Sequence, residues 1–324
     1  MHNTRPYKGF APNRDGSELA DLEVNSSIVA HIPVLAGILA EQIDLPRDGV
    51  MVDATIGQGG HSFLFGRKLG PEGVLIGLDV DKDSIQRAHF KLKDLQCRVI
   101  LIRANFSQIT EQLSEQHIEK VDFILADLGL CSSQLADTKM GLSFQMDSPL
   151  DMRMDERLKT TAADIVNKSD EKSLADLIYK FGQDRASRRI ARFIVGLRQS
   201  RPITTTAQLA AIVCKALQRP GPKKWTKIHP ATRTFQALRI AVNNELENLE
   251  KLLVAAPKLL NKSGHIAVIS YHSLEDRLVK NSFKQNKKDN VYSDCTKKPI
   301  VPSREEISEN PRARSAKLRI AQKS

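Results

Sequence analysis

The chain is poor in cysteine and in long apolar runs. Its 324 residues include four cysteines, which lie far apart and form no C-x-x-C pair. Neither a zinc cluster nor a disulfide framework is therefore expected, and we predict no metal site. So few cysteines fit a reducing compartment, and no apolar run approaches the roughly 18 residues that a membrane span needs. These absences favour a cytoplasmic protein that does not associate with membranes.

The first 29 residues lack the features of a targeting signal. They mix basic and acidic side chains and contain no apolar segment of the kind that a signal peptide has. We expect residues 1–29 to be an N-terminal extension of the folded chain.

Acidic residues are nearly missing from one region. Between Lys180 and Arg239 the sequence has 14 Lys or Arg residues and a single acid, Asp184, while the whole chain carries a net charge of +11. The basic character therefore belongs to this region, which favours a polyanionic partner such as nucleic acid. The alternative is an ordinary solvated surface, because runs of charge usually have no partner.

Residues 184–200 within this region have the pattern of an amphipathic helix. Apolar residues recur on one face, and arginines share another. Arginine can bind phosphate oxygens through two hydrogen bonds. The candidate nucleic-acid contacts on this face are Arg185, Arg188, Arg189 and Arg192.

The first half of the chain alternates apolar strands with helical patterns. Apolar runs separated by helices predict βαβ units around a parallel sheet. The expected strands are 50–56, 74–79, 98–103 and 121–126, and the expected helices are 61–69, 82–95 and 107–117.

From about Leu150 to Leu260 the pattern is nearly all helical. Thr205 and Gln208 form a candidate capping box at the start of one helix. The strand pattern returns at 264–270, a helix begins at Ser273, and a last strand is expected at 316–321. We therefore predict one α/β domain, residues 30–149 and 240–324, interrupted by an inserted helical, basic domain at 150–239.

A glycine-rich loop follows the first expected strand. It reads Gly57-Gln58-Gly59-Gly60-His61-Ser62, and the next strand ends about 20 residues later in Asp79. Glycine lets a ligand approach the backbone closely, and a carboxylate at that strand end can accept hydrogen bonds from ribose hydroxyls. The pattern indicates a ribose-bearing cofactor, although a tight turn without a ligand would have the same glycines.

This loop departs from the dinucleotide fingerprint G-x-G-x-x-G. Ser62 occupies the position of the third glycine, which argues against a pyrophosphate and so against a nicotinamide-dependent oxidoreductase. S-adenosylmethionine carries adenosine and an amino-acid tail without a pyrophosphate, and it is the cofactor that we expect.

Asp127 ends the fourth expected strand, at the edge where parallel sheets bind ligands. Its carboxylate could accept an N–H from an exocyclic amine and thereby make the nitrogen lone pair available for methylation. A hydrogen bond to the cofactor and a helix N-cap are equally open alternatives. Gln134, in the loop that follows, is a candidate contact to the adenine or to the amino-acid tail.

Six motifs in order make the chain resemble the bacterial small-subunit ribosomal RNA (cytosine-N4)-methyltransferases. Besides the glycine loop, they are His31-Ile32-Pro33-Val34-Leu35, Pro149-Leu150-Asp151-Met152-Arg153-Met154-Asp155, His229-Pro230-Ala231-Thr232-Arg233-Thr234-Phe235-Gln236-Ala237-Leu238-Arg239, Ser270-Tyr271-His272-Ser273-Leu274-Glu275-Asp276-Arg277 and Asn310-Pro311-Arg312-Ala313-Arg314-Ser315. The resemblance implies a Rossmann-like methyltransferase fold with a helical insert, methylation of N4 of a decoding-site cytidine in small-subunit ribosomal RNA or the 30S particle, and a homodimer.

The resemblance also implies a set of S-adenosylmethionine-binding residues. They are Gly59, Gly60, His61, Asp79, Phe106, Asp127 and Gln134. Arg233 and His272, in the shared motifs, are further RNA-binding candidates, and a structural role for His272 is the alternative. His61 could orient the cofactor or cap a helix. One departure is the run Cys131-Ser132-Ser133-Gln134, where the family has Ser-Ser-Pro-Gln.

Two competing functions remain. A ribosome-assembly factor without catalytic activity would use the basic region alone, but the intact glycine loop, Asp79 and Asp127 argue against it. A DNA amino-methyltransferase would have a Pro-Pro-aromatic run after Asp127, where Leu128 and Gly129 stand. The shared acidic and basic residues Asp151, Arg153 and Asp155 favour a brace of ion pairs at the domain junction.

Overall fold

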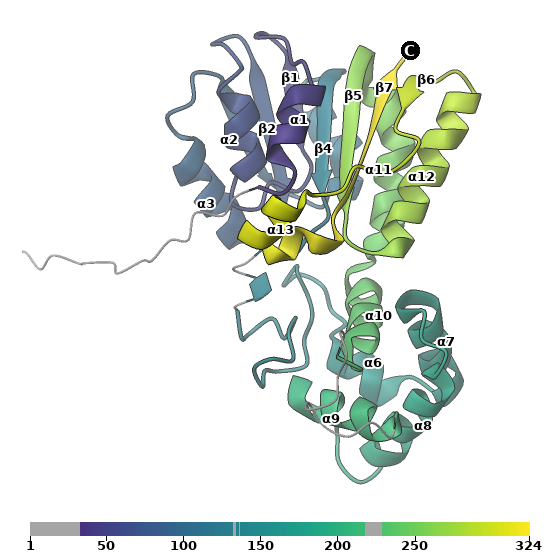
Figure 1. The fold of residues 1–324 in the computed structure, drawn as a ribbon. Coiled ribbons are helices and arrows are strands. Elements are labelled where there is room, and N and C mark those ends of the chain that lie inside the picture. Colours follow the sequence, from purple (N-terminus) through teal and green to yellow (C-terminus); the bar gives the residue numbers. More distant parts are fainter. Residues whose placement is uncertain (1–32, 132–133, 136, 218–228) are drawn as a thin grey trace, which may run out of the picture. The chain divides into compact units, whose positions relative to one another are not determined.

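The computed structural model describes residues 33–131, 134–135, 137–217 and 229–324 (Figure 1). The N-terminal extension expected at 1–29 lies outside these residues. So do His31 and Ile32 of the first shared motif, Ser132 and Ser133 of the loop after the fourth strand, and the helix break expected at 219–222.

A seven-stranded sheet with the order β3-β2-β1-β4-β5-β7-β6 organises the chain. Strands β1 to β5 are parallel, and β7 is antiparallel to both β5 and β6. The chain runs outward from β1 to β3 and then returns to β4 on the other side of β1, so the switch point where such sheets bind ligands lies between β1 and β4. The strands are β1 Val50–Asp53, β2 Val74–Asp79, β3 Arg98–Arg103, β4 Val121–Asp127, β5 Leu260–Ser270, β6 Tyr292–Cys295 and β7 Lys317–Lys323.

Helices pack on both faces of this sheet (Figure 1). Neighbouring strand residues point to opposite faces: Met51 and Phe123 belong to one apolar cluster, and Val52 and Ile124 to the other. The first cluster is shared with α1 Ala36–Gln42, α2 Gly60–Gly66 and α3 Lys82–Leu92, and the second with α4 Ile109–Glu115, α11 Glu245–Leu259 and α12 Ser273–Lys288. Short elements near the ends of strands are η1 Phe106–Gln108, α13 Arg304–Glu309 and η3 Pro311–Ser315.

A helical region between β4 and α11 has an apolar cluster of its own. Ile178, Ile190, Ile194, Leu209 and Leu238 are all fully buried in it. The expected Rossmann-like fold with a helical insert is thus confirmed. The described helices of this region are α6 Ala162–Lys168, α7 Glu171–Gly182, α8 Ser187–Arg198, α9 Thr206–Ala216 and α10 Thr232–Asn243.

The expected division of the chain into domains stays a prediction. Helix α10 runs without a break through residue 239, where the second boundary was placed, and Val242 still packs in the helical cluster. Leu150 packs in the same cluster.

Some expected elements have different bounds. Strand β1 ends at Asp53 rather than at residue 56, because the chain turns at residues 54–55, where Thr55 N donates to the Asp53 side chain. Residues 150–161 contain no helix, since this segment is held by ion pairs and turns, and α6 begins only at Ala162. Strand β5 begins at Leu260 instead of Gly264.

Strand β6 was not predicted at all. Its four residues include the exposed Ser293 and Asp294, which give it no apolar alternation, and only Tyr292 is fully buried. By contrast, the Thr205–Gln208 capping box and the start of α12 at Ser273 are confirmed. Among the described residues, no helix has the length and apolar character that crossing a membrane requires.

Candidate functional site

The loop from β1 to α2 lies at the carboxyl edge of the parallel strands. Gly57 and Gly59 have φ values of +49° and +75°, which L side chains rarely adopt. Gly60 is needed for space, because a Cβ there would lie 2.8 Å from Cγ of Pro33. Around the Cβ position of Gly57 only the Thr55 carbonyl comes within 4 Å, so a ligand can approach this part of the loop.

A buried carboxylate supports this loop from below, and sequence reasoning missed it. Asp53, the last residue of β1, is 2% exposed and accepts hydrogen bonds from Ser62 Oγ at 2.6 Å and from Thr55 N at 3.2 Å. Burial raises the pKa of Asp53 above its usual value. Ser62 therefore fills the third-glycine position with a hydroxyl that the buried carboxyl needs. An Asp that closes a strand just before a glycine loop was the available signal.

Asp79 closes β2 and holds the glycine loop in place. Its two oxygens accept hydrogen bonds from Gly57 N and Asp81 N, both at 2.9 Å. Burial raises the pKa of Asp79 to about 6. Because each carboxylate oxygen has two lone pairs, Asp79 can keep these bonds and still accept hydroxyl groups of a ligand.

His61 and Asp127 meet at the same edge, one from α2 and the other from the end of β4. Nε2 of His61 lies 3.6 Å from Oδ2 of Asp127, which is too long for a hydrogen bond. His61 is 7% exposed, and neither ring nitrogen has a hydrogen-bond partner among the described residues. A buried imidazole without hydrogen bonds is destabilising. This arrangement is typical of a binding site in which the ligand supplies the missing hydrogen-bond partner.

The capping alternative for His61 is not what the structure shows. The N-cap of α2 is Gly59, which has no side-chain hydrogen bond, and His61 is the second residue of the helix. Asp127 is fixed by its own turn: its backbone N donates to Thr55 Oγ1 at 2.7 Å, and its Oδ1 accepts from Gly129 N at 3.3 Å.

Tyr271 is a second residue that sequence reasoning missed at this edge. It directly follows β5, the parallel neighbour of β4, and its hydroxyl lies close enough to the Asp127 carboxylate for the two groups to interact. Burial, and then the negative charge of Asp127, raises the pKa of Tyr271 far above its usual value, so the hydroxyl stays protonated. Its position one residue beyond a parallel strand was the signal that could have found it.

The remaining predicted cofactor contacts lie on neighbouring loops of the same edge. Phe106 begins η1 after β3 and packs, half-buried, against the cluster that includes α11. Gln134 is 8% exposed, and its Oε1 accepts a hydrogen bond from Cys131 N at 3.1 Å. The structure thus joins Asp79 to the glycine loop and brings His61 near Asp127, while Phe106 and Gln134 lie on the loops that leave β3 and β4.

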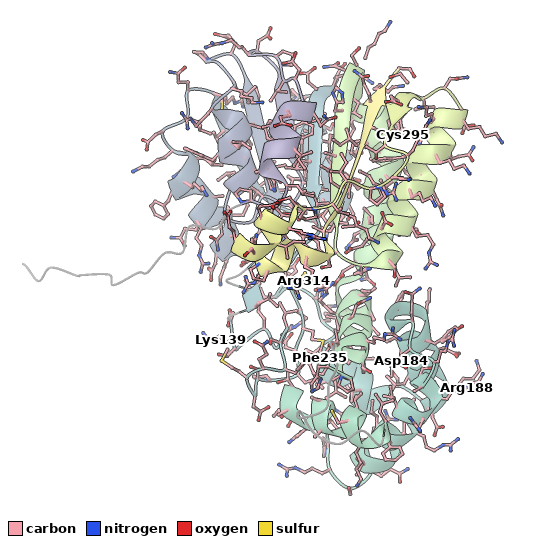
Figure 2. The ribbon with its side chains drawn as sticks, viewed as in Figure 1. Lys139, Asp184, Arg188, Phe235, Cys295 and Arg314 are labelled. Carbon is pink, nitrogen blue, oxygen red and sulfur yellow. The ribbon has the colours of Figure 1, made fainter. Side chains whose placement is uncertain are left out.

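The four arginines predicted to bind nucleic acid are all exposed on or beside α8, and Arg188 is labelled in Figure 2. The opposite face of α8 is buried, as the sequence pattern predicts. Asp184, the single acidic residue of the basic region, forms no ion pair with these arginines among the described residues. Asp184 is 8% exposed and accepts a hydrogen bond from Ala186 N at 2.9 Å. Arg192 lies 3.7 Å from Glu171, both exposed, which is a weak pair.

Arg233 and His272 differ in accessibility. Arg233 is exposed and donates to the carbonyl oxygen of Gln183 at 3.3 Å. The His272 side chain is only 9% exposed, caps α12 through Nδ1, and lies 3.2 Å from Oε1 of Glu275. The structure therefore supports the structural alternative for His272, because a buried N-cap is poorly placed to touch RNA.

His272 belongs to a buried charge cluster that ties α10 and α11 to α12. Arg239 pairs with both oxygens of Glu245, at 2.8 and 3.0 Å. Burial tends to raise the pKa of Glu245, but Arg239 and His272 outweigh it and hold that pKa below its usual value. Burial raises the pKa of Glu275. In the described part of the chain, Glu245, His272 and Glu275 are the one trio spaced to hold a metal ion, yet the Arg239 guanidinium already supplies the positive charge.

The predicted brace of ion pairs is present in part. Arg153 binds both oxygens of Asp151, at 2.7 and 2.8 Å, whereas Asp155 pairs with Arg157 instead. The same segment is joined to the end of α10, because Asn243 Oδ1 accepts a hydrogen bond from Met154 N at 2.8 Å. These contacts indicate a structural role for the shared acidic and basic residues.

The sequence model of the MraW methylase family matches residues 28–324. This chain belongs to the MraW methylase family. Similar proteins named "Ribosomal RNA small subunit methyltransferase H" come from Acidobacterium capsulatum (48% identical, covering 90% of this chain and 98% of the relative), Clostridioides difficile (43%, 90% and 98%) and Cyanothece sp. (48%, 90% and 94%).

Membership of the MraW methylase family confirms the expected enzyme class, an S-adenosylmethionine-dependent methyltransferase. A solved O-methyltransferase from Thermotoga maritima is 9% identical, with a TM-score of 0.40 over 89% of this chain and 64% of that chain. At this identity and TM-score the likeness is too weak to assign a fold, and the fold assignment rests on the strand order and the family.

Proposed function

We propose that this MraW-family methylase transfers the methyl group of S-adenosylmethionine to the exocyclic N4 amine of a cytidine in the decoding region of small-subunit ribosomal RNA. The observation that carries the proposal is the buried His61 at the switch point of the sheet: its Nε2 lies 3.6 Å from Asp127, and neither of its ring nitrogens has a hydrogen-bond partner among the described residues. The names of the relatives support ribosomal RNA as the substrate class.

The cofactor would lie across the carboxyl ends of β1, β2 and β4. The Asp79 carboxylate accepts the ribose hydroxyls with its free lone pairs, and the loop at Gly59 and Gly60 lets the amino-acid tail approach the backbone. Phe106, after β3, packs against the adenine. His61 donates to the cofactor, which removes the cost of its unpaired ring nitrogens.

Asp127 is the group that we assign to the chemistry. An amine conjugated with the cytosine ring is a poor nucleophile, and a carboxylate that accepts one N–H makes its lone pair more available. S-adenosylmethionine, when bound, would supply an activated methyl group: the nitrogen lone pair would form the bond to the methyl carbon while the S–C bond breaks and its electrons remain on sulfur as a neutral thioether. The extra proton on nitrogen passes to the Asp127 carboxylate and from there to water. The rest is positioning.

The arginine face of α8 would hold the RNA backbone. Clustered arginines without nearby acids suit phosphate oxygens. One contact supports this proposal: Ser273 Oγ, at the start of α12, donates to Gln183 Oε1 at 2.7 Å, two residues before Arg185. The homodimer and the cytoplasmic setting expected from the sequence stay predictions.

The decisive test is a methylation assay with labelled S-adenosylmethionine on small ribosomal subunits from cells lacking this enzyme, followed by nucleoside mass spectrometry. We expect N4-methylcytidine at one position of the small-subunit RNA. If the cofactor binds but no methyl group reaches subunits, free RNA or precursor particles, the assembly-factor alternative replaces this proposal.

A further inference from the structure

The loop after β5 contributes an aromatic residue to the reaction edge. In the parallel pair of β4 and β5, Asp127 is opposite Ile269, and Leu128 N donates to the Ile269 carbonyl at 2.9 Å. Tyr271 is two residues beyond Ile269, so it reaches the same edge as Asp127 although 144 positions of sequence separate them.

The ring of Tyr271 rests directly on the backbone of Gly129. A Cβ added to Gly129 would lie 2.7 Å from Cε2, 2.8 Å from Cζ and 3.0 Å from the hydroxyl oxygen of Tyr271. Real Cβ atoms essentially never approach so closely, so any side chain at residue 129 would displace the ring. Gly129 has an ordinary negative φ and is therefore required for this contact rather than for its backbone conformation.

The backbone of Tyr271 is fixed from the other side. Its N–H donates to Oε2 of Glu275 at 2.8 Å, and the same oxygen accepts from His272 N at 3.2 Å. Glu275 is 3% exposed and belongs to the charge cluster with Arg239 and Glu245. The backbone that carries the Tyr271 ring is thus fixed, and a side chain can orient a neighbouring group only when its own position is fixed.

We infer that Tyr271 is a positioning residue: its hydroxyl donates to the Asp127 carboxylate and turns that group so that the remaining lone pairs face the amine to be methylated. This position of the Tyr271 ring requires glycine at residue 129, because only a residue without a side chain leaves room for the ring. This inference rests on the proposed role of Asp127 in the reaction. Gly129 N donates to one oxygen of the Asp127 carboxylate, and a second donor is needed to fix the orientation of the carboxylate plane.

The test compares Tyr271→Phe, which keeps the ring, with Tyr292→Phe as a matched control. Tyr292 is buried in β6, 5.6 Å between ring centroids from Phe283, and its hydroxyl has no partner among the described residues. For Tyr271→Phe we expect kcat to fall about tenfold while the Kd for S-adenosylmethionine changes less than about twofold. The control should keep both constants. A kcat for Tyr271→Phe within twofold of the parent would overturn the inference.

A double-mutant cycle separates positioning from mere stabilisation. In an Asp127→Asn background, we expect Tyr271→Phe to lower kcat by less than about twofold, because the hydroxyl acts through the carboxylate. An undiminished tenfold loss in that background would contradict the inference. Gly129→Ala, which displaces the ring and keeps the phenol, should reproduce the loss of kcat.

The parent enzyme is assayed for N4-methylcytidine beside the variants. If the parent transfers no methyl group, the proposed function fails. If the parent is active and Tyr271→Phe equals it, the inference about Tyr271 alone fails.

Discussion

The sheet edge and the helical region use charge in opposite ways. At the edge, Asp53 and His61 are buried and Asp79 is half-buried, and the two carboxylates are tied to the loop by hydrogen bonds of 2.6 to 3.2 Å. On α8, Arg188, Arg189 and Arg192 are exposed, and Glu171 is the only acid paired with one of them among the described residues.

This difference has a physical consequence for each region. Buried groups in fixed geometry act strongly on a few atoms, so a single substitution at the edge should have a large effect. Exposed charges are screened by salt, so the arginine face should act as a sum of small contributions. The predictions that follow test this contrast, from the largest effect to the smallest.

Removing the Asp127 carboxylate should have the largest effect. For Asp127→Asn we expect kcat to fall by roughly 10²-fold or more, since a positioned acceptor of the amine proton contributes on that scale. Steady-state methylation of small subunits measures it. Asp176→Asn, an exposed carboxylate of α7 with a 64% exposed side chain, is the matched control and should be fully active. A kcat near the parent value for Asp127→Asn would exclude this role.

Substitution of Asp79 should act on cofactor binding. For Asp79→Ala we expect a loss of about 1–3 kcal/mol in the binding free energy of S-adenosylmethionine, the scale of hydrogen bonds to a charged group. The free energy of unfolding should be measured in parallel, because Asp79 also holds the backbone of Gly57. Calorimetry that gives unchanged affinity would contradict the ribose assignment.

Charge reversal on α8 should weaken RNA binding and spare the cofactor. For Arg188→Glu, Arg189→Glu and Arg192→Glu together, we expect an RNA affinity about 30-fold lower and a reduced salt dependence. Reversal of the exposed α12 lysines Lys280, Lys284 and Lys288 is the control with the same change in charge. Equal losses in both triple variants would show that net charge, not this face, binds the RNA.

Low pH should weaken the binding of S-adenosylmethionine, because Asp79 becomes protonated. Because its pKa is raised to about 6, the carboxylate is mostly ionised at pH 7 and mostly protonated at pH 5. Affinity for S-adenosylmethionine should therefore fall by about tenfold between these values.

The same shift has the reverse sign for folding. A pKa above the unfolded value of 3.8 means that the folded state binds this proton more tightly, so the contribution of Asp79 to stability grows as the pH falls from above 6 towards 4. Asp79→Asn should remove both dependences. A parent affinity that stays flat from pH 7 to 5 would contradict the assignment.

Local sequence patterns predicted much of the architecture. The β2 and β3 bounds and the start of β4 agree with the structure because apolar runs flanked by helical patterns determine buried parallel strands locally. The capping box at Thr205 and the amphipathic face of α8 were also visible, since each depends on residues within a few positions. Strand β6 could not be predicted from the sequence, because its polar residues do not alternate with apolar ones.

The sequence by itself determined the glycine loop, the acidic ends of β2 and β4, the basic region and the family, because these are patterns of neighbouring residues. Only the tertiary structure decided which side chains meet. Tyr271 reaches Asp127 because β5 lies beside β4, and Ser62 satisfies Asp53 because α2 folds back over β1. His272 turned out to be a buried cap for the same reason: burial depends on helices α10, α11 and α12 packing together, which no local pattern contains.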